Sequence, residues 1–106
     1  MKLYGEYCKA MYDREMISND HSFFVYKSFE DGSLYIHSIY TTPEARGKGA
    51  YLELEQELIN KVKPSSIFCY VDTTANDPTL SLKAILKSGY TIFSTTSDSI
   101  MLKKDM

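Results

Sequence analysis

The residues of this chain best suited to chemistry form one run, Pro43-Glu44-Ala45-Arg46-Gly47-Lys48-Gly49-Ala50, between a strand-like and a helix-like segment. Glycines at such a junction let backbone amides approach an anion, and the positive end of the helix dipole favours negative charge there. Arg46 and Lys48 add positive side chains. The run therefore predicts a loop that cradles a pyrophosphate group.

Other phosphate-binding loops fit this run less well. A Walker A loop ends in G-K-[ST], whereas Gly49 is followed by Ala50 and Tyr51. A dinucleotide-binding fingerprint needs three glycines, and the run has two. The remaining alternative is a glycine-containing connection that binds nothing, but the run holds more glycines and basic residues than a turn requires.

The segments before the loop predict three strands. Residues 3–12 are rich in tyrosine and partly alternating, which favours a strand, and the polar residues 13–20 indicate a turn or a loose connection. Residues 22–29 and 33–41 predict two more strands, joined by a hairpin turn at Asp31-Gly32. Alternation along the third strand places Leu34, Ile36, Ser38 and Tyr40 on one face and Ser33, Tyr35, His37 and Ile39 on the other.

The segments after the loop predict two helices and three strands. Residues 50–63 carry an apolar stripe at helical spacing, made of Tyr51, Leu54, Leu58 and Val62, and Pro64 ends the helix. Residues 66–71 are typical of a buried strand. A second helix begins with Asn76-Asp77 as cap and Pro78 in its first turn, turns Leu82, Ile85 and Leu86 inward, and ends at Gly89. Residues 90–94 and 99–103 predict the last strands.

The predicted order is therefore β-β-β-α-β-α-β-β within a single domain that covers residues 1–106. This is an α/β (α+β) fold whose sheet is mixed, because hairpins flank a central right-handed βαβ unit. Ligands of open α/β sheets bind at the carboxyl ends of strands, and the glycine loop lies at such an end.

Composition narrows the classes of function. A net charge of −2 and a pI near 5.6 argue against a nucleic-acid-binding protein. No apolar run approaches the roughly 20 residues that span a bilayer, and the first residues do not resemble a signal peptide. Cys8 and Cys69 fit neither a disulfide framework nor a metal motif, so we expect free thiols, with Cys69 in the core, and no bound metal. These features predict a cytoplasmic protein.

The loop resembles the acyl-CoA-binding motif of the GNAT superfamily of N-acetyltransferases, written [QR]-x-x-G-x-[GA]. Arg46 takes the first position of that motif and Gly49 the fourth, while Tyr51 replaces the small residue of the sixth. Lys87-Ser88-Gly89-Tyr90 is similar to the K-x-G-[FY] ending of the last helix of the family. The resemblance covers residues 22–103 and implies a GNAT-like, mostly antiparallel sheet in which strand 33–41 splays from its parallel neighbour 66–71.

The resemblance implies that acetyl-CoA is the acyl donor. In the family, loop amides bind its pyrophosphate, the backbone of the strand before the loop binds its pantetheine arm like an added strand, and an amide near Ile39 faces the thioester carbonyl. An asparagine often stands at the start of the last helix; Pro78 takes its place here and Asn76 lies two residues away. The expected donor-binding residues are Ile39, Thr41, Arg46, Gly47, Lys48, Gly49, Ala50, Tyr51 and Asn76.

The expected catalytic residues are His37 and Tyr35. Many members of the family use a tyrosine four residues before the helix-ending glycine as a general acid, and that position is Ile85 here. Some members carry a base nine residues before the motif arginine, where this chain has His37, on the same predicted face as Tyr35. The alternative is a histidine that is simply packed on the sheet.

Three further side chains receive structural interpretations. A buried tyrosine with a satisfied hydroxyl is the expectation for Tyr70. His21 is expected on the surface. Cys69 is a poor candidate nucleophile, because nothing nearby in the sequence would lower its pKa.

Three functions fit the sequence. The first is an acetyl-CoA-dependent N-acetyltransferase in which a primary amine attacks directly; the acceptor side should be open, because residues 13–20 leave no room for the two helices that wall it in longer members of the family. An open side favours a protein or peptide amine, or a site completed by a second subunit in a homodimer. The second is a GNAT-fold module that binds CoA or a protein partner without efficient catalysis, and the third is an unrelated α/β protein that acts by interaction alone.

Overall fold

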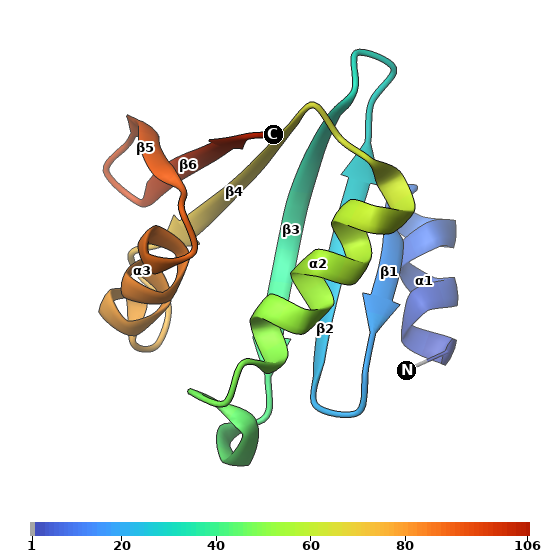
Figure 1. The fold of residues 1–106 in the computed structure, drawn as a ribbon, viewed down its shortest axis with the longest axis horizontal. Helices are drawn as coiled ribbons and strands as arrows, with labels where there is room; N and C mark the ends of the chain where they lie inside the picture. The colour runs from blue at the N-terminus through green and yellow to red at the C-terminus, as the bar shows by residue number, and fades with distance from the viewer. Residues whose placement is uncertain (1) are drawn as a thin grey trace.

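A computed structural model describes residues 2–106 as a mixed α/β fold, which confirms the predicted class (Figure 1). The elements are α1 (Lys2–Tyr12), β1 (Glu15–Ser18), β2 (Ser22–Ser28), β3 (Ser33–Thr41), the 3-10 turn η1 (Pro43–Ala45), α2 (Ala50–Val62), β4 (Ser66–Asp72), α3 (Pro78–Lys87), β5 (Thr91–Thr95) and β6 (Ser99–Asp105). No helix among these residues is long and apolar enough to cross a bilayer.

The six strands form one sheet in the order β1-β2-β3-β4-β6-β5, and among its neighbouring pairs β3 and β4 are parallel while the others are antiparallel. Both α2 and α3 pack on one face of the sheet, where their apolar side chains join a single core. Its members from strands and helices include Phe24, Leu34, Ile67, Leu102, Leu54, Leu58 and Ile85. In Figure 1, α2 crosses in front of β2 and β3, and α1 lies beside β1, at one edge of the sheet.

The prediction of a strand at residues 3–12 was wrong, because these residues form α1. Its apolar residues occur in neighbouring pairs four residues apart, a helical period that outweighs the strand preference of tyrosine; the pairs are Leu3-Tyr4, Tyr7-Cys8 and Met11-Tyr12. Cys8 is buried, and the ring of Tyr4 contacts the ring of Phe23 at 5.6 Å. Since Phe23 alternates with the core residue Phe24, α1 covers the face of the sheet opposite α2.

The interpretation of residues 13–20 as a loose connection was also wrong. They contain β1, which pairs with β2 from Glu15↔Tyr26 to Ser18↔Phe23. The strand is short, and only its pairing with β2 identifies it. After α1, the elements nevertheless follow the predicted order β-β-β-α-β-α-β-β.

The parallel pair of β3 and β4 is unusually short. Three residue pairs join the strands, from Ser33↔Ser66 to Tyr35↔Phe68. Beyond Tyr35 the strands diverge, and Figure 1 shows them opening into a V toward the end of β3 that leads into η1. The predicted splay is therefore present.

A β-bulge at His37 changes which side chains of β3 face the core. Ile36 pairs with Tyr26 and Ser38 pairs with Val25, so His37 is an extra residue opposite the β2 ladder. An extra residue reverses the alternation of faces beyond it. Ile39 therefore packs against the core and Tyr40 is exposed on the α1 side, which corrects the prediction for both residues.

Helix α3, the second of the two helices predicted from the sequence, differs from its prediction near both ends. Leu86 was predicted to face inward and is exposed. Asp77 is the N-cap residue of α3, with a left-handed φ of 51° and no side-chain capping bond. Pro78 opens the helix and Gly89 follows it with a φ of 102°, as predicted.

A buried carboxylate joins α2 to the far end of the sheet. Glu55 is 3% exposed; its Oε1 accepts from Lys104 Nζ at 2.9 Å, and its Oε2 accepts from the hydroxyls of Tyr51 at 3.0 Å and Tyr90 at 3.1 Å. A buried charge is stable only with such partners. The cluster therefore fixes α2 relative to β6 and the start of β5.

We expect Glu55→Ala to lower the free energy of unfolding by about 2–3 kcal/mol, because it leaves Lys104 and two phenols without their acceptor. Glu53→Ala, at an exposed position of the same helix, is the control. Urea denaturation measures both, and equal losses in the two variants would contradict this role for Glu55.

Candidate active site

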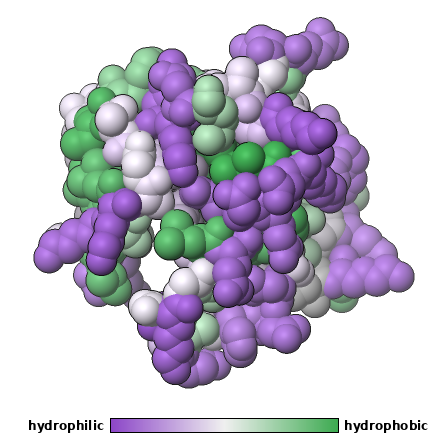
Figure 2. Space-filling model, viewed as in Figure 1, coloured by the Kyte–Doolittle hydropathy of each residue, from purple (hydrophilic) through white to green (hydrophobic). Residues whose placement is uncertain are grey.

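A groove of about 900 Å³ occupies the gap between the diverging strands. Ile36, Val71 and Ile85 line it from the core side, and His37 and Tyr70 line it from the opposite side of the sheet. The groove is therefore lined from both faces of the sheet. In Figure 2, which views the α2 face, green hydrophobic side chains lie at the centre of this face between purple hydrophilic ones.

The glycine loop forms one end of this groove. Gly47 and Gly49 have φ values of 77° and 86°, which favour glycine over residues with a side chain. A Cβ at either position would meet no atom within 4 Å, so the backbone of the loop faces open space. The loop can therefore bring its main chain directly against a ligand.

The backbone N–H groups of the loop and of the first turn of α2 are free. The first hydrogen bond of the helix runs from Glu53 N to Gly49 O at 3.0 Å. Five N–H groups before it have no acceptor among residues 2–106; they belong to Gly47, Gly49, Ala50, Tyr51 and Leu52. These five residues also line the groove. Together with the helix dipole, this arrangement suits a phosphate or pyrophosphate group.

The two basic residues of the loop point to different places. Arg46 lines the groove, donates from Nε to Thr41 O at 3.0 Å and lies over the ring of Tyr40 at 5.8 Å. Lys48 does not line the groove; it borders a smaller hollow of about 340 Å³ with His21 and Glu44. The structure thus brings Arg46, but not Lys48, to the other expected donor-binding residues.

The edge of β3 supplies further polar groups that lack a strand partner, although Thr41 O accepts from Arg46 Nε. Ile39 and Thr41 line the groove beyond the last pair with β4, where the backbone groups that point toward β4 have no strand partner. The hydroxyl of Thr42, next to the loop, is buried and has no hydrogen-bond partner within residues 2–106. Thr42 does not line the groove, but the backbone groups of Ile39 and Thr41 that lack a strand partner make this edge suited to a ligand with donors and acceptors.

The opposite wall of the groove comes from α3 and the residues before it. Asn76 lines it as expected, and Ile85 takes the place of the family's tyrosine. The small residues Ser81, Ala84 and Ser88 also line the groove, although they were not predicted to do so. Their signal was present, because small side chains three and four residues apart form one open face of a helix.

His37 lies at the bulge, half-buried, where the strands begin to separate. Its ring stacks on Tyr35 with centroids 6.5 Å apart and an interplanar angle of 23°. Burial lowers the pKa of His37, and the positive charges of Arg14 and Lys27 lower it further. The imidazole is therefore neutral at neutral pH and has a free acceptor nitrogen for a proton.

The other predicted side chains differ in whether they line the groove. Tyr35 lies outside the groove, on the α1 side of the sheet, where it stacks on Phe68. Tyr70 is 45% exposed and lines the groove, so the prediction that it is buried was wrong. Cys69 is in the core, as predicted; burial raises its pKa to about 12, which keeps the thiol protonated. His21 is exposed, as predicted.

Among residues 2–106, no three His, Cys, Asp or Glu side chains lie close enough together to hold a metal ion. Both cysteines of the chain are free thiols.

The structure is similar to several solved acetyltransferase structures. A protein assigned to the GNAT family of acetyltransferases from Desulfovibrio desulfuricans superposes with a TM-score of 0.74 and 12% identity, over 92% of this chain and 74% of that one. PaiA N-acetyltransferase from Thermoplasma acidophilum, solved with coenzyme A, gives a TM-score of 0.76 and 16% identity, over 99% and 70%. The chain has the GNAT fold. Nourseothricin acetyltransferase gives a TM-score of 0.65 and 19% identity, over 89% and 66%.

The sequence itself matches no family model and no curated protein, so the relation to the GNAT fold is one of structure. The chain spans about two thirds to three quarters of these three structures. The GNAT resemblance expected from the loop and from Lys87-Ser88-Gly89-Tyr90 is confirmed for the fold.

We expect His37 to titrate below pH 6.5, its ordinary pKa, because burial and two cations disfavour the imidazolium. Lys27→Ala should raise the pKa of His37 by removing one of those charges. NMR titration of the imidazole protons measures both values. A pKa at or above 6.5 in the unmodified protein would contradict this account of the site.

Proposed function

We propose that this protein is an acetyl-CoA-dependent N-acetyltransferase that acts on an exposed primary amine. The observation that carries the proposal is the set of five unbonded N–H groups at the end of a groove between splayed strands. The fold supports the same assignment, since one structure with this fold is a complex with coenzyme A.

The chain offers binding groups for each part of the donor. The free amides of Gly47, Gly49, Ala50, Tyr51 and Leu52 hold the pyrophosphate, with Arg46 as the nearby positive charge. The free edge of β3 at Ile39 and Thr41 pairs with the pantetheine arm as an added strand would. Asn76, on the opposite wall, contacts the donor from the α3 side.

Acetyl-CoA supplies an acetyl group activated as a thioester. An amide of β3 near Ile39 donates to the thioester carbonyl oxygen and stabilises the negative charge that develops there. His37 accepts the proton that the acceptor amine loses, either directly or through a water molecule. Its location at the origin of the splay and its neutral imidazole support this role.

A second function is favoured by a specific observation. The place of the general-acid tyrosine is filled by Ile85, which is buried, and the hydroxyl of Tyr51 is bonded to Glu55. A GNAT-fold module that binds CoA without efficient catalysis would have the same donor groove and no need for a general acid. The two functions differ in whether thiol is released.

Two measurements test the proposal. Acetyl-CoA should raise the melting temperature, and a mixture of amines and peptides should cause release of free CoA thiol, detected with a thiol reagent. Stabilisation without thiol release would favour the binding module, and no stabilisation would refute both functions.

We expect Arg46→Ala to weaken CoA binding roughly tenfold, the size of one charge-assisted interaction. Lys48→Ala should change binding much less, because Lys48 borders the other hollow. Isothermal titration with CoA measures both variants. If Lys48→Ala had the larger effect, the orientation of the loop described above would be wrong.

We expect His37→Gln to lower kcat/KM by a factor of roughly 10² or more, as for removal of a general base. In the unmodified enzyme the rate should fall as pH drops through the pKa of His37, which lies below 6.5. Glutamine does not titrate, so this acidic limb should disappear in the variant. A full rate with an unchanged pH profile would remove His37 from the mechanism.

A further inference from the structure

The face of the sheet opposite α2 and α3 carries a row of side chains that the donor groove does not use. Four residues from neighbouring strands lie in register across it, as Lys27↔Tyr35, Tyr35↔Phe68 and Phe68↔Lys103. We call Lys27, Tyr35, Phe68 and Lys103 the aromatic row. The row has two rings at its centre and a lysine at each end.

The rings of the row form an apolar patch that presents their edges outward. Tyr35 and Phe68 stack with centroids 4.8 Å apart and an interplanar angle of 12°. Phe29 packs edge-on against Tyr35 at 5.3 Å, and Phe93 packs edge-on against Phe68 at 5.5 Å. Phe93 is 59% exposed on β5, whose five residues are all exposed, and a bulge makes it an extra residue between the pairs of Ile92 and Ser94. Side chains of this kind bind partners when they are exposed together.

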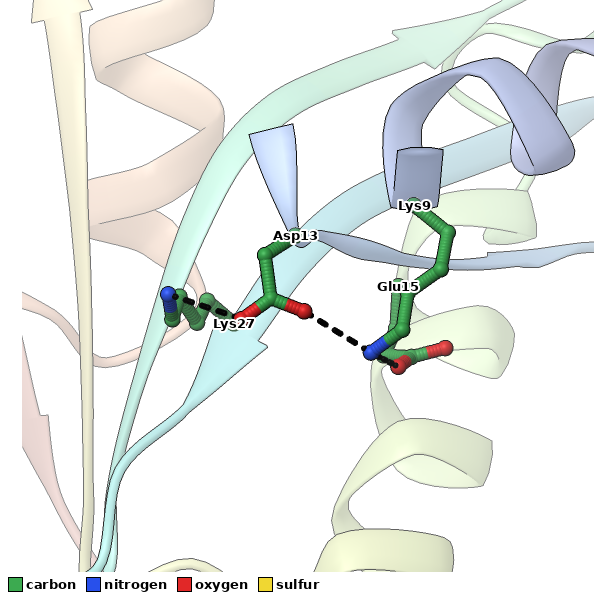
Figure 3. Close-up of polar contacts among 4 residues, drawn as sticks. All are labelled: Lys9, Asp13, Glu15 and Lys27. Atoms are coloured by element: carbon green, nitrogen blue, oxygen red, sulfur yellow. Dashed lines mark hydrogen bonds and ion pairs between the residues drawn. The ribbon is translucent and has the colours of Figure 1, made fainter. Parts of the chain in front are cut away.

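The lysines of the row lie over aromatic rings, Lys103 Nζ over Phe68 at 5.6 Å and Lys27 Nζ over Phe29 at 5.8 Å, and they pair with exposed carboxylates. Lys103 Nζ lies 3.2 Å from Asp105, and Lys27 Nζ lies 3.4 Å from Asp13, which also pairs with Lys9 (Figure 3). The side chains of Asp105 and Asp13 are 75% and 67% exposed. Such pairs contribute about 0–1 kcal/mol, so a carboxylate of a ligand can replace the partner at little cost.

The charge close to His37 is positive. Arg14 and Lys27 are the charged groups that act on its imidazole, and both lower its pKa. A cationic acceptor would be repelled from this position, whereas an anionic one would be attracted. The same positive charges lower the pKa of an amine bound beside His37, which favours its unprotonated, nucleophilic form.

The length of the row indicates the size of its ligand. Neighbouring strands lie about 4.8 Å apart, so the backbones of Lys27 and Lys103, three strand spacings apart, are separated by roughly 14 Å. An extended chain advances about 3.3 Å per residue, and two of its side chains about four residues apart would match both lysines. An aromatic side chain between them would lie over Tyr35 and Phe68.

We propose that the aromatic row binds the acceptor as an extended acidic peptide, with two carboxylates about four residues apart and an aromatic residue between them, and so presents its amine to His37. The inference rests on the proposed acetyltransferase function and adds the class of acceptor to it. His37 follows Tyr35 by two residues on β3 and lines the groove. A peptide bound on the row would therefore lie next to the residue at which the groove begins.

The test uses three fluorescent peptides of equal length, each with a free amine and a central tyrosine. The first has two glutamates four residues apart, the second has glutamines in their place and the third has lysines. Fluorescence anisotropy of each peptide with the full chain measures binding, and thiol release measures KM and kcat. We expect the glutamate peptide to bind at least tenfold more tightly than the glutamine peptide, with a lower KM and with affinity that falls as salt rises.

The variant Lys27→Glu/Lys103→Glu should reverse this order and favour the lysine peptide. Because Lys27 also lowers the pKa of His37, kcat should change as well, so the order of peptide affinities measured by anisotropy decides the outcome. Lys61→Glu/Lys63→Glu, at exposed positions at the end of α2, has the same change in net charge and should keep the original order. Lys27→Gln/Lys103→Gln is a milder variant that should abolish the preference and most of the salt dependence.

The outcomes separate the two proposals. Unchanged peptide preference in both row variants would overturn the acidic-peptide inference, whether or not thiol is released. Tight, row-dependent binding of the glutamate peptide without thiol release would support the row as a docking surface and refute the acetyltransferase function. Equal effects of the row variants and the α2 variant would mean that net charge alone acts, which also overturns the inference.

Discussion

The central constraint in this structure is the short parallel pairing of β3 with β4. Two strands in the middle of a sheet normally satisfy each other along their whole length, but here three residue pairs form and the strands then separate. Beyond Tyr35, each strand has backbone groups without a strand partner. The groove, the free edge at Ile39 and Thr41, and the position of His37 all follow from this separation.

Several features hold the strands apart. The bulge at His37 reverses the faces of β3, so that Ile39 turns into the core beside Phe24 and Tyr51. On the far side of the gap, the Glu55 cluster ties α2 to Lys104 on β6. Because β6 pairs with β4 along its whole length, this cluster also fixes β4 relative to the helix. The gap is thus built into the packed core, and a ligand need not open it.

The parts of the site that the sequence predicted depend on local patterns. The loop could be predicted because its glycines and Arg46 lie within a few residues of each other. They stand between a segment whose apolar residues alternate as in a strand and one whose apolar residues recur as in a helix. The features that were missed depend on distant residues. Glu55 is buried because Lys104 and Tyr90 meet it from 49 and 35 residues away, and the bulge at His37 exists only in register with β2. In α1 the helical period was present, but the tyrosines favoured the wrong prediction.

The two sides of the splay are suited to different partners. On the α2 side, the free amides and the helix dipole suit a phosphorylated ligand, and on the other side the aromatic row suits a chain that lies flat across four strands. His37 borders both regions, because the bulge places it where the strands part. In the proposed acetyltransferase, the donor and the acceptor would therefore approach this histidine from opposite faces. Since α1 covers the β1–β2 edge of the second face, it leaves the partly buried rings of Tyr35 and Phe68 uncovered.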